Sequence, residues 1–408
     1  MRFHPAIFWK GDSGLLHTDF IVPRACGQGE PSLRVIVIGG AGFIGSHLVD
    51  ALVGGGHQVR VVDSLDPQVH PTGLPPCFLN PAAEFVRQDI REIDGLRSAL
   101  EDASAVYHLA GAVGVGDSMY RIRHYTEVNL QGSSNLLEIL ANTRHAVRKV
   151  ILASSVTVYG EGKYSCPKHG VAYPSLRSSE QVTRREWELA CPGRDGGVSC
   201  GLPLEPLPTD EEKPLAPQSI YAITKRAQEE LFLAVGRSYG IPVTVLRYFN
   251  VIGPRQAVSN PYTGVAKNFS LEIAAGKAPV IFEDGLQTRD FVHVSDVNQA
   301  NLLALVNPDA DGQVFNVGTG RATTRLELAR TLSTRLGSKI PLEPSLKYRI
   351  GDVRHCFADI SKAQKLLGFA PKVLFPEGLD NLPPEASSAG VGVLEKAHSE
   401  LRDRGLIR

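Results

Sequence analysis

Leu33-Arg-Val-Ile-Val-Ile-Gly-Gly-Ala-Gly-Phe-Ile-Gly45 is the stretch of sequence that decides the fold. Its first six residues form a short β-branched run, which is typical of a buried parallel strand. An apolar pattern from Phe43 to Gly54 predicts a helix directly after the glycines. The glycines leave room for close approach of the backbone, and the helix N-terminus offers free N–H groups with a partial positive charge. Together they predict a phosphate-binding turn.

Asp63 indicates which ligand this turn takes. It follows a second predicted strand, Gln58–Val62, about 20 residues beyond the glycine turn. A carboxylate there can accept hydrogen bonds from adenosine ribose hydroxyls and would repel a 2′-phosphate, so the pairing predicts NAD rather than NADP. The glycine spacing is one residue longer than the usual dinucleotide fingerprint. An aspartate that merely caps the turn after the strand is the alternative interpretation.

Further predicted strands and helices alternate along the chain. Strands are predicted at Ala105–Leu109, Lys149–Ala153 and Val243–Arg247, and helices at Asn129–Asn142 and Ala222–Ser238. This alternation predicts an α/β protein with a doubly wound, Rossmann-type parallel sheet. We expect an irregular extension over residues 1–32, an NAD-binding Rossmann domain over 33–250 with an insertion at about 162–213, a smaller substrate-binding region over 251–375 and a C-terminal tail over 376–408.

The bulk composition argues against several classes of partner. Lys plus Arg and Asp plus Glu number 43 each, so no net field favours nucleic acid or an anionic membrane surface. No apolar run approaches the roughly 18 residues needed to span a bilayer, and the first residues do not form a secretory signal. Six cysteines are too few for a disulfide framework. We therefore expect a cytoplasmic protein that binds neither nucleic acid nor membrane.

Tyr221 and Lys225 lie at positions i and i+4 of a predicted helix and therefore share one face. A phenol has a pKa of about 10 and is a poor base until a neighbouring cation, here Lys225, stabilises the phenolate. The hydroxyl of Ser155, at the end of a predicted strand, can complete such a site. Surface helices often carry the same spacing by chance, so the pair alone does not establish chemistry.

Several further motifs occur in a fixed order along the chain. They are Asp89-Ile-Arg91, His108-Leu-Ala-Gly111, Val158-Tyr-Gly160, Leu246-Arg-Tyr-Phe-Asn250, Arg289-Asp-Phe-Val-His-Val294, Phe315-Asn-Val-Gly-Thr-Gly320 and Arg349-Ile-Gly-Asp352. With the glycine turn and Tyr221, they resemble the extended short-chain dehydrogenase/reductase family, the NAD-dependent nucleotide-sugar epimerases and dehydratases. The resemblance covers roughly Leu33 to Pro371 apart from the insertion, and it is closest to the 4-epimerases.

The resemblance implies a role for each matching residue. Tyr221 is then the general base or acid at a sugar hydroxyl, Lys225 lowers its pKa and holds the nicotinamide ribose, and Ser155 hydrogen-bonds the reacting oxygen. The implied cofactor-binding residues are Gly39, Gly42, Phe43, Ile44, Gly45, Asp63, Asp89, Ile90, Leu109, Ala110, Asn129, Tyr221, Lys225 and Phe249. The implied substrate-binding residues are Ser155, Thr157, Asn250, Arg289, Arg349 and Asp352, of which the charged ones also fit ordinary solvated surface groups.

The two residues after Ser155 discriminate between reactions in this family. Dehydratases have an acidic pair there and decarboxylases typically keep a glutamate at the second position, whereas Val156 and Thr157 cannot exchange protons at neutral pH. The resemblance therefore implies an isomerase, a 4-epimerase that oxidises C4 transiently to a 4-keto sugar and returns hydride to the opposite face. The alternatives are a net nucleotide-sugar oxidoreductase, a 4,6-dehydratase or decarboxylase relative, and a catalytically silent binding protein. A UDP-, dTDP- or GDP-linked sugar as substrate and a homodimer are further implications.

The predicted insertion carries Cys166-Pro-Lys-His169, followed by Cys191 and Cys200. Thiolate and imidazole ligands suit tetrahedral zinc, so these four residues are candidate ligands of a structural zinc ion. The pattern favours metal-free thiols in a loop, and the zinc site is the alternative interpretation. Because the insertion ends shortly before Tyr221, it also suits a lid over the sugar.

Overall fold

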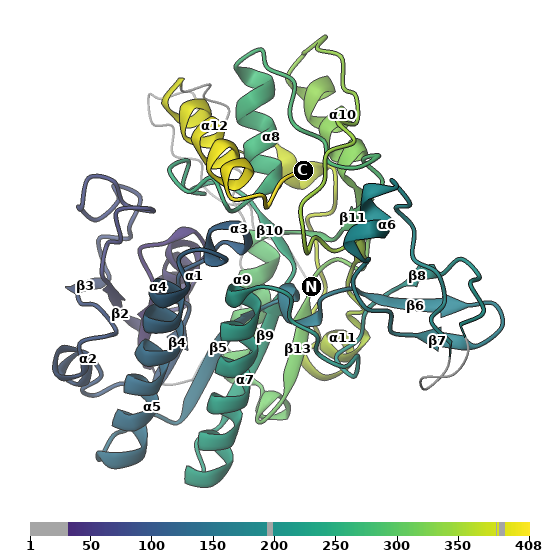
Figure 1. Cartoon of the computed structure of the whole chain (residues 1–408). Helices are drawn as coiled ribbons and strands as arrows, with labels where there is room; N and C mark the ends of the chain where they lie inside the picture. Colours follow the sequence, from purple (N-terminus) through teal and green to yellow (C-terminus); the bar gives the residue numbers. More distant parts are fainter. Residues whose placement is uncertain (1–31, 194–198, 381, 383–387) are drawn as a thin grey trace, which may run out of the picture. The chain divides into compact units, whose positions relative to one another are not determined.

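The structure, a computed structural model, describes residues 32–193, 199–380, 382 and 388–408. The expected N-terminal extension lies outside the described residues except for Ser32. Seven parallel strands form the central sheet in the order β13-β9-β5-β4-β1-β2-β3 (Figure 1). Because the order runs outward in both directions from the neighbours β1 and β4, the predicted doubly wound sheet is confirmed. The strands are β1 (Arg34–Ile38), β2 (Gln58–Asp63), β3 (Glu84–Arg87), β4 (Ala105–His108), β5 (Lys149–Ser155), β9 (Val243–Tyr248) and β13 (Val314–Val317).

Both faces of the sheet are covered by helices, which explains why its inner strands are apolar without alternation. On one face, Val35 and Val37 of β1 pack with helices α1 (Phe43–Gly54) and α9 (Val294–Val306). On the other, Ile36 and Ile38 pack with α2 (Ile93–Ala99), α5 (Gly132–Asn142) and α7 (Ile220–Tyr239). Figure 1 shows α5 and α7 side by side across the sheet. Within the described residues, no helix is both long and apolar enough to cross a membrane.

Helix α7 has local signals at both of its ends. The Ser219 hydroxyl caps its start by accepting a hydrogen bond from the Ala222 amide at 3.1 Å. Gly240 ends the helix in the left-handed conformation, with a φ of 66°. These caps place Tyr221 in the first turn of the helix, at the edge of the sheet where the parallel strands end.

The part of the chain after β9 builds a second core beside the sheet. Residues of α8 (Val265–Ala274) and α10 (Arg325–Arg335) form this core with Phe291 and Phe375. The final helix, α12 (Ser388–Asp403), lies beside α8, and the segment after it pairs with Arg349 through Ile407 (Figure 1). From Ser32 to Arg408 the chain forms one compact unit, so the expected division at residues 250 and 375 stays a prediction.

The insertion folds into a small antiparallel sheet of its own, in the order β7-β6-β8. Its strands are β6 (Lys163–Cys166), β7 (Gly170–Ala172) and β8 (Glu205–Leu207), and helix α6 (Ser179–Thr183) lies between β7 and β8 in the sequence. The remaining elements are α3 (Val115–Ser118), α4 (Ile122–Thr126), η1 (Glu127–Gln131), η2 (Val156–Tyr159), β10 (Asn250–Ile252), β11 (Thr288–Arg289), β12 (Phe291–His293), η3 (Pro308–Ala310), β14 (Thr323–Thr324), β15 (His355–Cys356), α11 (Ser361–Leu367) and η4 (Glu377–Leu379).

Candidate active site

A cavity of about 440 Å³ lies where the parallel strands end, next to the switch point between β1 and β4. This edge of a doubly wound sheet is where such folds bind ligands, because the loops after the strands diverge there. Most of the predicted site residues meet on its wall. They are Gly39, Gly42, Phe43, Ile44, Gly45, Asp63, Asp89, Ile90, Leu109, Ala110, Ser155, Thr157, Tyr221, Lys225, Phe249 and Asn250.

The glycine turn after β1 tolerates no side chain at two of its positions. A Cβ on Gly39, where φ is 85°, would lie 2.6 Å from the Ala110 amide nitrogen. A Cβ on Gly45 would lie 2.2 Å from the Gly39 carbonyl oxygen. The two glycines therefore let the loop after β4 and the start of α1 pack directly against the turn, which leaves backbone amides at the cavity.

Asp63 ends β2 and holds the turn by its carboxylate. One oxygen accepts from the Ala41 amide at 3.0 Å and the other from the Leu65 amide at 2.9 Å. Burial raises the pKa of this carboxyl above its usual range, against these two hydrogen bonds. Each carboxylate oxygen has a second lone pair, so the same group can also accept from a ligand in the cavity. Asp63 thus does cap the following turn, and its ribose role stays a prediction.

Ser155 and Tyr221 come from different elements and meet in the cavity. Ser155 is the last residue of β5, and its hydroxyl oxygen accepts a hydrogen bond from the Thr157 hydroxyl at 3.0 Å. Burial raises the pKa of Tyr221 to about 12, while a hydrogen bond with Ser155 lowers it. The serine is therefore the group that stabilises the phenolate in this structure.

Lys225 lies one helical turn after Tyr221 and is buried. Its ammonium group donates to the Ala153 carbonyl oxygen at 2.9 Å. Burial lowers the pKa of Lys225 to about 8, although the carboxylate of Glu229 acts in the opposite direction. The predicted effect of Lys225 on the pKa of Tyr221 thus has no direct hydrogen bond behind it here and stays a prediction.

Asn129 lies behind the cavity wall and acts on the backbone. Its side-chain oxygen accepts from the Ala112 amide at 2.8 Å, and its amide nitrogen donates to the Ala112 carbonyl at 3.1 Å. The same nitrogen donates to the Thr224 hydroxyl at 3.0 Å. Asn129 therefore ties the loop after β4 to the helix that carries Tyr221.

Arg289, Arg349 and Asp352 are brought together, but away from the cavity wall. Arg289 donates to the Asp352 carboxylate at 3.0 Å, and Arg325 forms an ion pair with it at 3.6 Å. We call these four residues the arginine cluster. Burial alone would raise the pKa of Asp352, but Arg325, Arg289 and Arg349 outweigh it and lower the pKa to about 2.

Two buried guanidinium nitrogens in the arginine cluster lack a partner among the described residues. They are the Nε atoms of Arg325 and Arg349. Burial lowers the pKa of Arg325 to about 10 and also lowers that of Arg349. Unpaired buried donors beside three positive charges suit an anionic group, because guanidinium groups bind phosphate oxygens well.

Sequence reasoning missed three residues that shape these sites. Arg325 starts α10 directly after its capping residue Thr324, a position where an arginine is usually exposed. Gln256 lines the cavity, and its buried carbonyl oxygen has no partner among the described residues, as is also true of the Asn250 side-chain oxygen. Lys267 donates at 2.7 Å to the carbonyls of both Ala257 and Asn260, which fixes the loop on that wall. Of these three residues only Gln256 had a signal in the sequence that could have identified it, because it is a polar residue that follows a strand.

The sequence model of the NAD dependent epimerase/dehydratase family matches residues 35–179 and 200–318. The chain belongs to this family. The expectation of an NAD-dependent epimerase-type enzyme is thereby confirmed at the level of the family.

Named relatives of this epimerase/dehydratase family member carry out more than one reaction. The chain is 32% identical to dTDP-L-rhamnose 4-epimerase of Burkholderia thailandensis over 351 residues, 86% of this chain and 93% of that protein. It is 29% identical to UDP-N-acetyl-alpha-D-glucosaminuronate decarboxylase of Bacillus cytotoxicus over 356 residues, 85% and 95% of the two chains. The solved UDP-glucuronic acid 4-epimerase of Bacillus cereus, in complex with UDP-glucuronic acid and NAD, matches with a TM-score of 0.66 at 27% identity, covering 89% of this chain and 99% of that one.

This epimerase/dehydratase also holds the four predicted zinc ligands together in its insertion. The ligand atoms of Cys166, His169, Cys191 and Cys200 all lie within 4.8 Å of one another. Cys166 and Cys191 are buried, and the other two residues are partly exposed. The cluster lies outside the cavity wall, so it is a second site rather than part of the first.

Proposed function

We propose that this chain is an NAD-dependent nucleotide-sugar 4-epimerase. The observation that carries the proposal is the composition of the cavity wall around Ser155. Tyr221 meets Ser155 there, while Val156 and Thr157, the two residues after the serine, line the same cavity without a carboxyl group. Inversion at C4 requires one acid–base group, which Tyr221 supplies, whereas elimination of water requires a second acid–base group, which Val156 and Thr157 do not provide.

The residues on the cavity wall fit NAD. Gly39 and Gly45 leave the turn after β1 free of side chains, and Asp63 keeps unused lone pairs on its carboxylate oxygens. We assign the diphosphate to the glycine turn and the adenosine ribose to Asp63, with Asp89, Ile90, Leu109, Ala110 and Phe249 along the remaining wall. When bound, NAD supplies the acceptor for the C4 hydride and its donor on return.

The protein's own part in the reaction is proton transfer and positioning. Tyr221 takes the proton from the C4 hydroxyl as that carbon is oxidised and returns it when the carbon is reduced. Ser155 forms a hydrogen bond with Tyr221, and by donating to the phenolate oxygen it favours the charged form of this base. Lys225, held by the Ala153 carbonyl, adds a positive charge one turn away.

The substrate assignment rests on two sets of residues, one on the cavity wall and one in the arginine cluster. Thr157 and Asn250 line the cavity, and the unpaired oxygen of Asn250 is free to accept from a sugar hydroxyl. We assign Arg289, Arg349 and Asp352 to the nucleotide end, where the arginine cluster offers unpaired donors. The named relatives act on dTDP- and UDP-sugars, which makes these the first substrates to test.

The test is incubation of the purified chain with UDP-, dTDP- and GDP-hexoses, followed by NMR at C4. We expect inversion at C4 with no net change in absorbance at 340 nm, and no inversion with Tyr221→Phe. A 4-keto-6-deoxy product would instead support a dehydratase. Carbon dioxide released from a UDP-uronic acid would support a decarboxylase, and accumulating NADH a net oxidoreductase.

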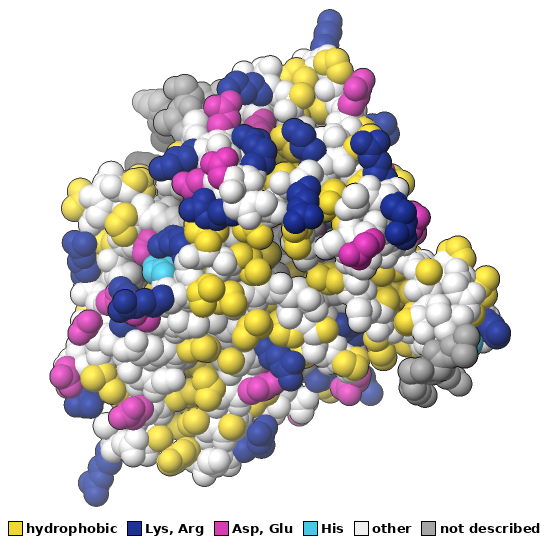
Figure 2. Space-filling view, viewed as in Figure 1, with side chains coloured by type: hydrophobic (Ala, Val, Ile, Leu, Met, Phe, Trp, Pro, Cys, Tyr) yellow, Lys and Arg dark blue, Asp and Glu magenta, His cyan; other side chains and the backbone are white. Residues whose placement is uncertain are grey.

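We also propose a homodimer in the cytoplasm, with zinc as a second, structural cofactor. Apolar side chains on α4 and α7, including Ile122, Ile223 and Leu231, are 38–50% exposed. Figure 2 shows hydrophobic side chains gathered at the lower centre of the view, where Figure 1 draws α5 and α7, and this supports a partner there. The described cysteines are all free, as expected of a reducing compartment. The convergence of Cys166, His169, Cys191 and Cys200 supports the zinc assignment.

A further inference from the structure

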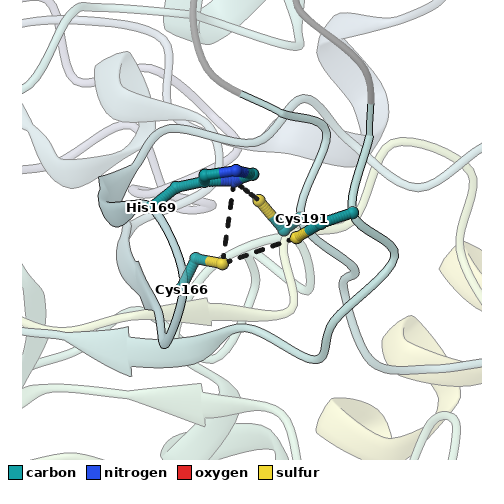
Figure 3. A group of neighbouring side chains, drawn as sticks. Cys166, His169 and Cys191 are labelled. Carbon is teal, nitrogen blue, oxygen red and sulfur yellow. Dashed lines mark hydrogen bonds between the residues drawn. The ribbon is translucent and has the colours of Figure 1, made fainter.

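The Cys/His cluster joins segments that are far apart in the sequence of the insertion. Cys166 ends β6, and His169 lies in the turn before β7. Cys191 and Cys200 belong to the loop that leads to β8. Figure 3 shows the side chains of Cys166, His169 and Cys191 pointing toward one another from these segments.

The distances within the cluster suit a tetrahedral metal. Around zinc, with Zn–S of about 2.3 Å and Zn–N of about 2.0–2.1 Å, ligand atoms lie roughly 3.5–3.8 Å apart. The Cys166 and Cys200 sulfurs are 3.7 Å apart, and the His169 Nδ1 atom lies 3.2 Å from the Cys191 sulfur and 4.0 Å from the Cys166 sulfur. At 3.7 Å the two sulfurs are not bonded to each other, since a disulfide is about 2.05 Å long.

The sheet of the insertion has only a small core of its own. Its strands contain only three or four residues each, and its apolar cluster consists of six buried residues, two of which are Cys166 and Cys191. Isolated short hairpins are marginally stable in water, and small folds of this kind commonly rely on a metal or on disulfides. Three thiols and an imidazole gathered beside the end of β6 are best explained by a bound ion.

The loop that ends at Cys191 is in direct contact with residues next to the arginine cluster. Glu188, three residues before Cys191, accepts from the Nε of Arg354 at 3.0 Å and pairs with His355 at 3.2 Å. Arg354 is fully buried and follows Asp352 by two residues. The position of Glu188 is therefore coupled to the segment that carries Asp352.

The segment between β7 and α6 forms a second contact with the arginine cluster. Arg177 donates to the Asp352 carbonyl oxygen at 3.0 Å and to the Glu283 carboxylate at 2.8 Å. Leu176, Ser179 and Val182 form, with Arg177, one wall of a cavity of about 30 Å³ whose other wall is residues 349–352. The insertion thus lies directly against Arg349 and Asp352, two of the residues proposed to bind the nucleotide.

We infer that a zinc ion bound by Cys166, His169, Cys191 and Cys200 clamps the insertion, and that the clamp sets the position of Arg177 and Glu188 against the arginine cluster. The metal then controls affinity for the nucleotide part of the substrate without touching the reacting atoms. The zinc ion proposed above does not depend on the epimerase reaction, whereas its effect on substrate affinity rests on that proposed function.

The first experiment measures the metal in the full-length protein. Purification without chelators from zinc-supplemented cells, followed by elemental analysis, should give about one zinc per chain. Cys191→Ser and His169→Gln should lose most of it, and Cys77→Ser, which alters an exposed cysteine outside the cluster, should keep it. Less than about a tenth of an equivalent in the unaltered protein overturns the inference, as does a Cys166–Cys200 disulfide seen as a loss of two hydrogens by mass spectrometry.

The second experiment measures nucleotide affinity and needs no catalysis. UDP and dTDP are titrated into the zinc-loaded protein and into the same protein stripped with a chelator, and bound NAD is measured in parallel. We expect stripping to weaken nucleotide binding about tenfold while NAD content is unchanged, because the two sites lie on different parts of the fold. Equal nucleotide affinity in both forms overturns the clamp. If neither nucleotide binds the zinc-loaded protein, the proposed function fails while the metal site stands.

Discussion

Replacement of Ser155 by alanine should slow the reaction by raising the pKa of Tyr221. In this structure burial raises the pKa of the Tyr221 phenol and a hydrogen bond with Ser155 lowers it, and the pKa that results is about 12. A hydroxyl that donates to the phenolate stabilises the charged form of Tyr221 more than the neutral form. Without it, the pKa of Tyr221 rises, and a smaller fraction of the enzyme carries the base at any pH below that value.

The size of the effect follows from the strength of one hydrogen bond to a charged group. Such bonds contribute about 1.5–3 kcal/mol, and one pKa unit corresponds to about 1.4 kcal/mol. The pKa of Tyr221 should therefore rise by about 1–2 units in Ser155→Ala. Well below the pKa, kcat/KM should fall by about 10- to 100-fold, because the rate follows the phenolate fraction.

The assay is kcat/KM for the epimerised sugar nucleotide from pH 6 to 10 in the unaltered enzyme, Ser155→Ala and Ser154→Ala. Ser154 is the matched control, because it is the neighbouring serine and its hydroxyl donates to Glu229 rather than to Tyr221. The rising limb of the profile should move to higher pH only in Ser155→Ala. A fall of less than about threefold over this pH range, or a fall that comes entirely from a higher KM, would refute the reasoning, since Ser155 would then not act on the pKa of Tyr221.

Three further changes test other parts of the structure. Asp63→Asn should weaken NAD binding about tenfold and should reduce the preference for NAD over NADP, because the amide repels a 2′-phosphate less than the carboxylate does. Titration with each cofactor measures both affinities, and an unchanged preference for NAD would contradict the assignment of Asp63 to the adenosine ribose. Glu229→Gln should lower the unfolding free energy measured in urea by about 3–5 kcal/mol, since it removes the carboxylate that lies 2.7 Å from the buried guanidinium of Arg247. If the cost comes from the unpaired charge, the double variant Glu229→Leu/Arg247→Met should recover much of that loss. The pKa of Asp352 is lowered to about 2, so its ionised carboxylate stabilises the folded protein fully above the unfolded pKa of about 3.9, and roughly 2 kcal/mol of this stability is lost as pH falls toward 2. In Asp352→Asn the unfolding free energy should be lower near neutral pH but should fall less steeply between about pH 5 and 2. Parallel curves of unfolding free energy against pH for the two proteins would contradict the ion pairing of Asp352 with the arginines.

Local features of the sequence were sufficient to predict the fold and the centre of the candidate site. The β-branched run before Gly39 and the helix pattern from Phe43 are properties of neighbouring residues, so they can be read without knowing the rest of the fold. The same holds for Tyr221 and Lys225, because helical geometry alone puts positions i and i+4 on one face. Edge strands β3 and β13 were missed, since polar residues interrupt or bound their short apolar patterns.

Side-chain partnerships between distant residues were decided only by the tertiary structure. Asp63 was expected at a ribose, but its bonds to the Ala41 and Leu65 amides depend on how the turn folds back over β2. Arg289 and Asp352 were predicted separately, and only the pairing of β11 with β15 places them together with Arg325, away from the cavity wall. No local pattern records such contacts.

The glycine turn and the Cys/His cluster show this division most clearly. Gly45 is required by a contact with the Gly39 carbonyl inside its own turn, so the sequence by itself determined that turn, whereas Gly39 also makes room for the Ala110 amide in the loop after β4, a contact that the tertiary structure decides. The sequence also showed the four candidate ligands Cys166, His169, Cys191 and Cys200. Whether they could bind one metal ion depended on whether the β6–β7 hairpin and the loop before β8 come together. The structure brings those four ligand atoms within 4.8 Å, because side chains separated by up to 34 positions become neighbours only through the folding of the chain between them.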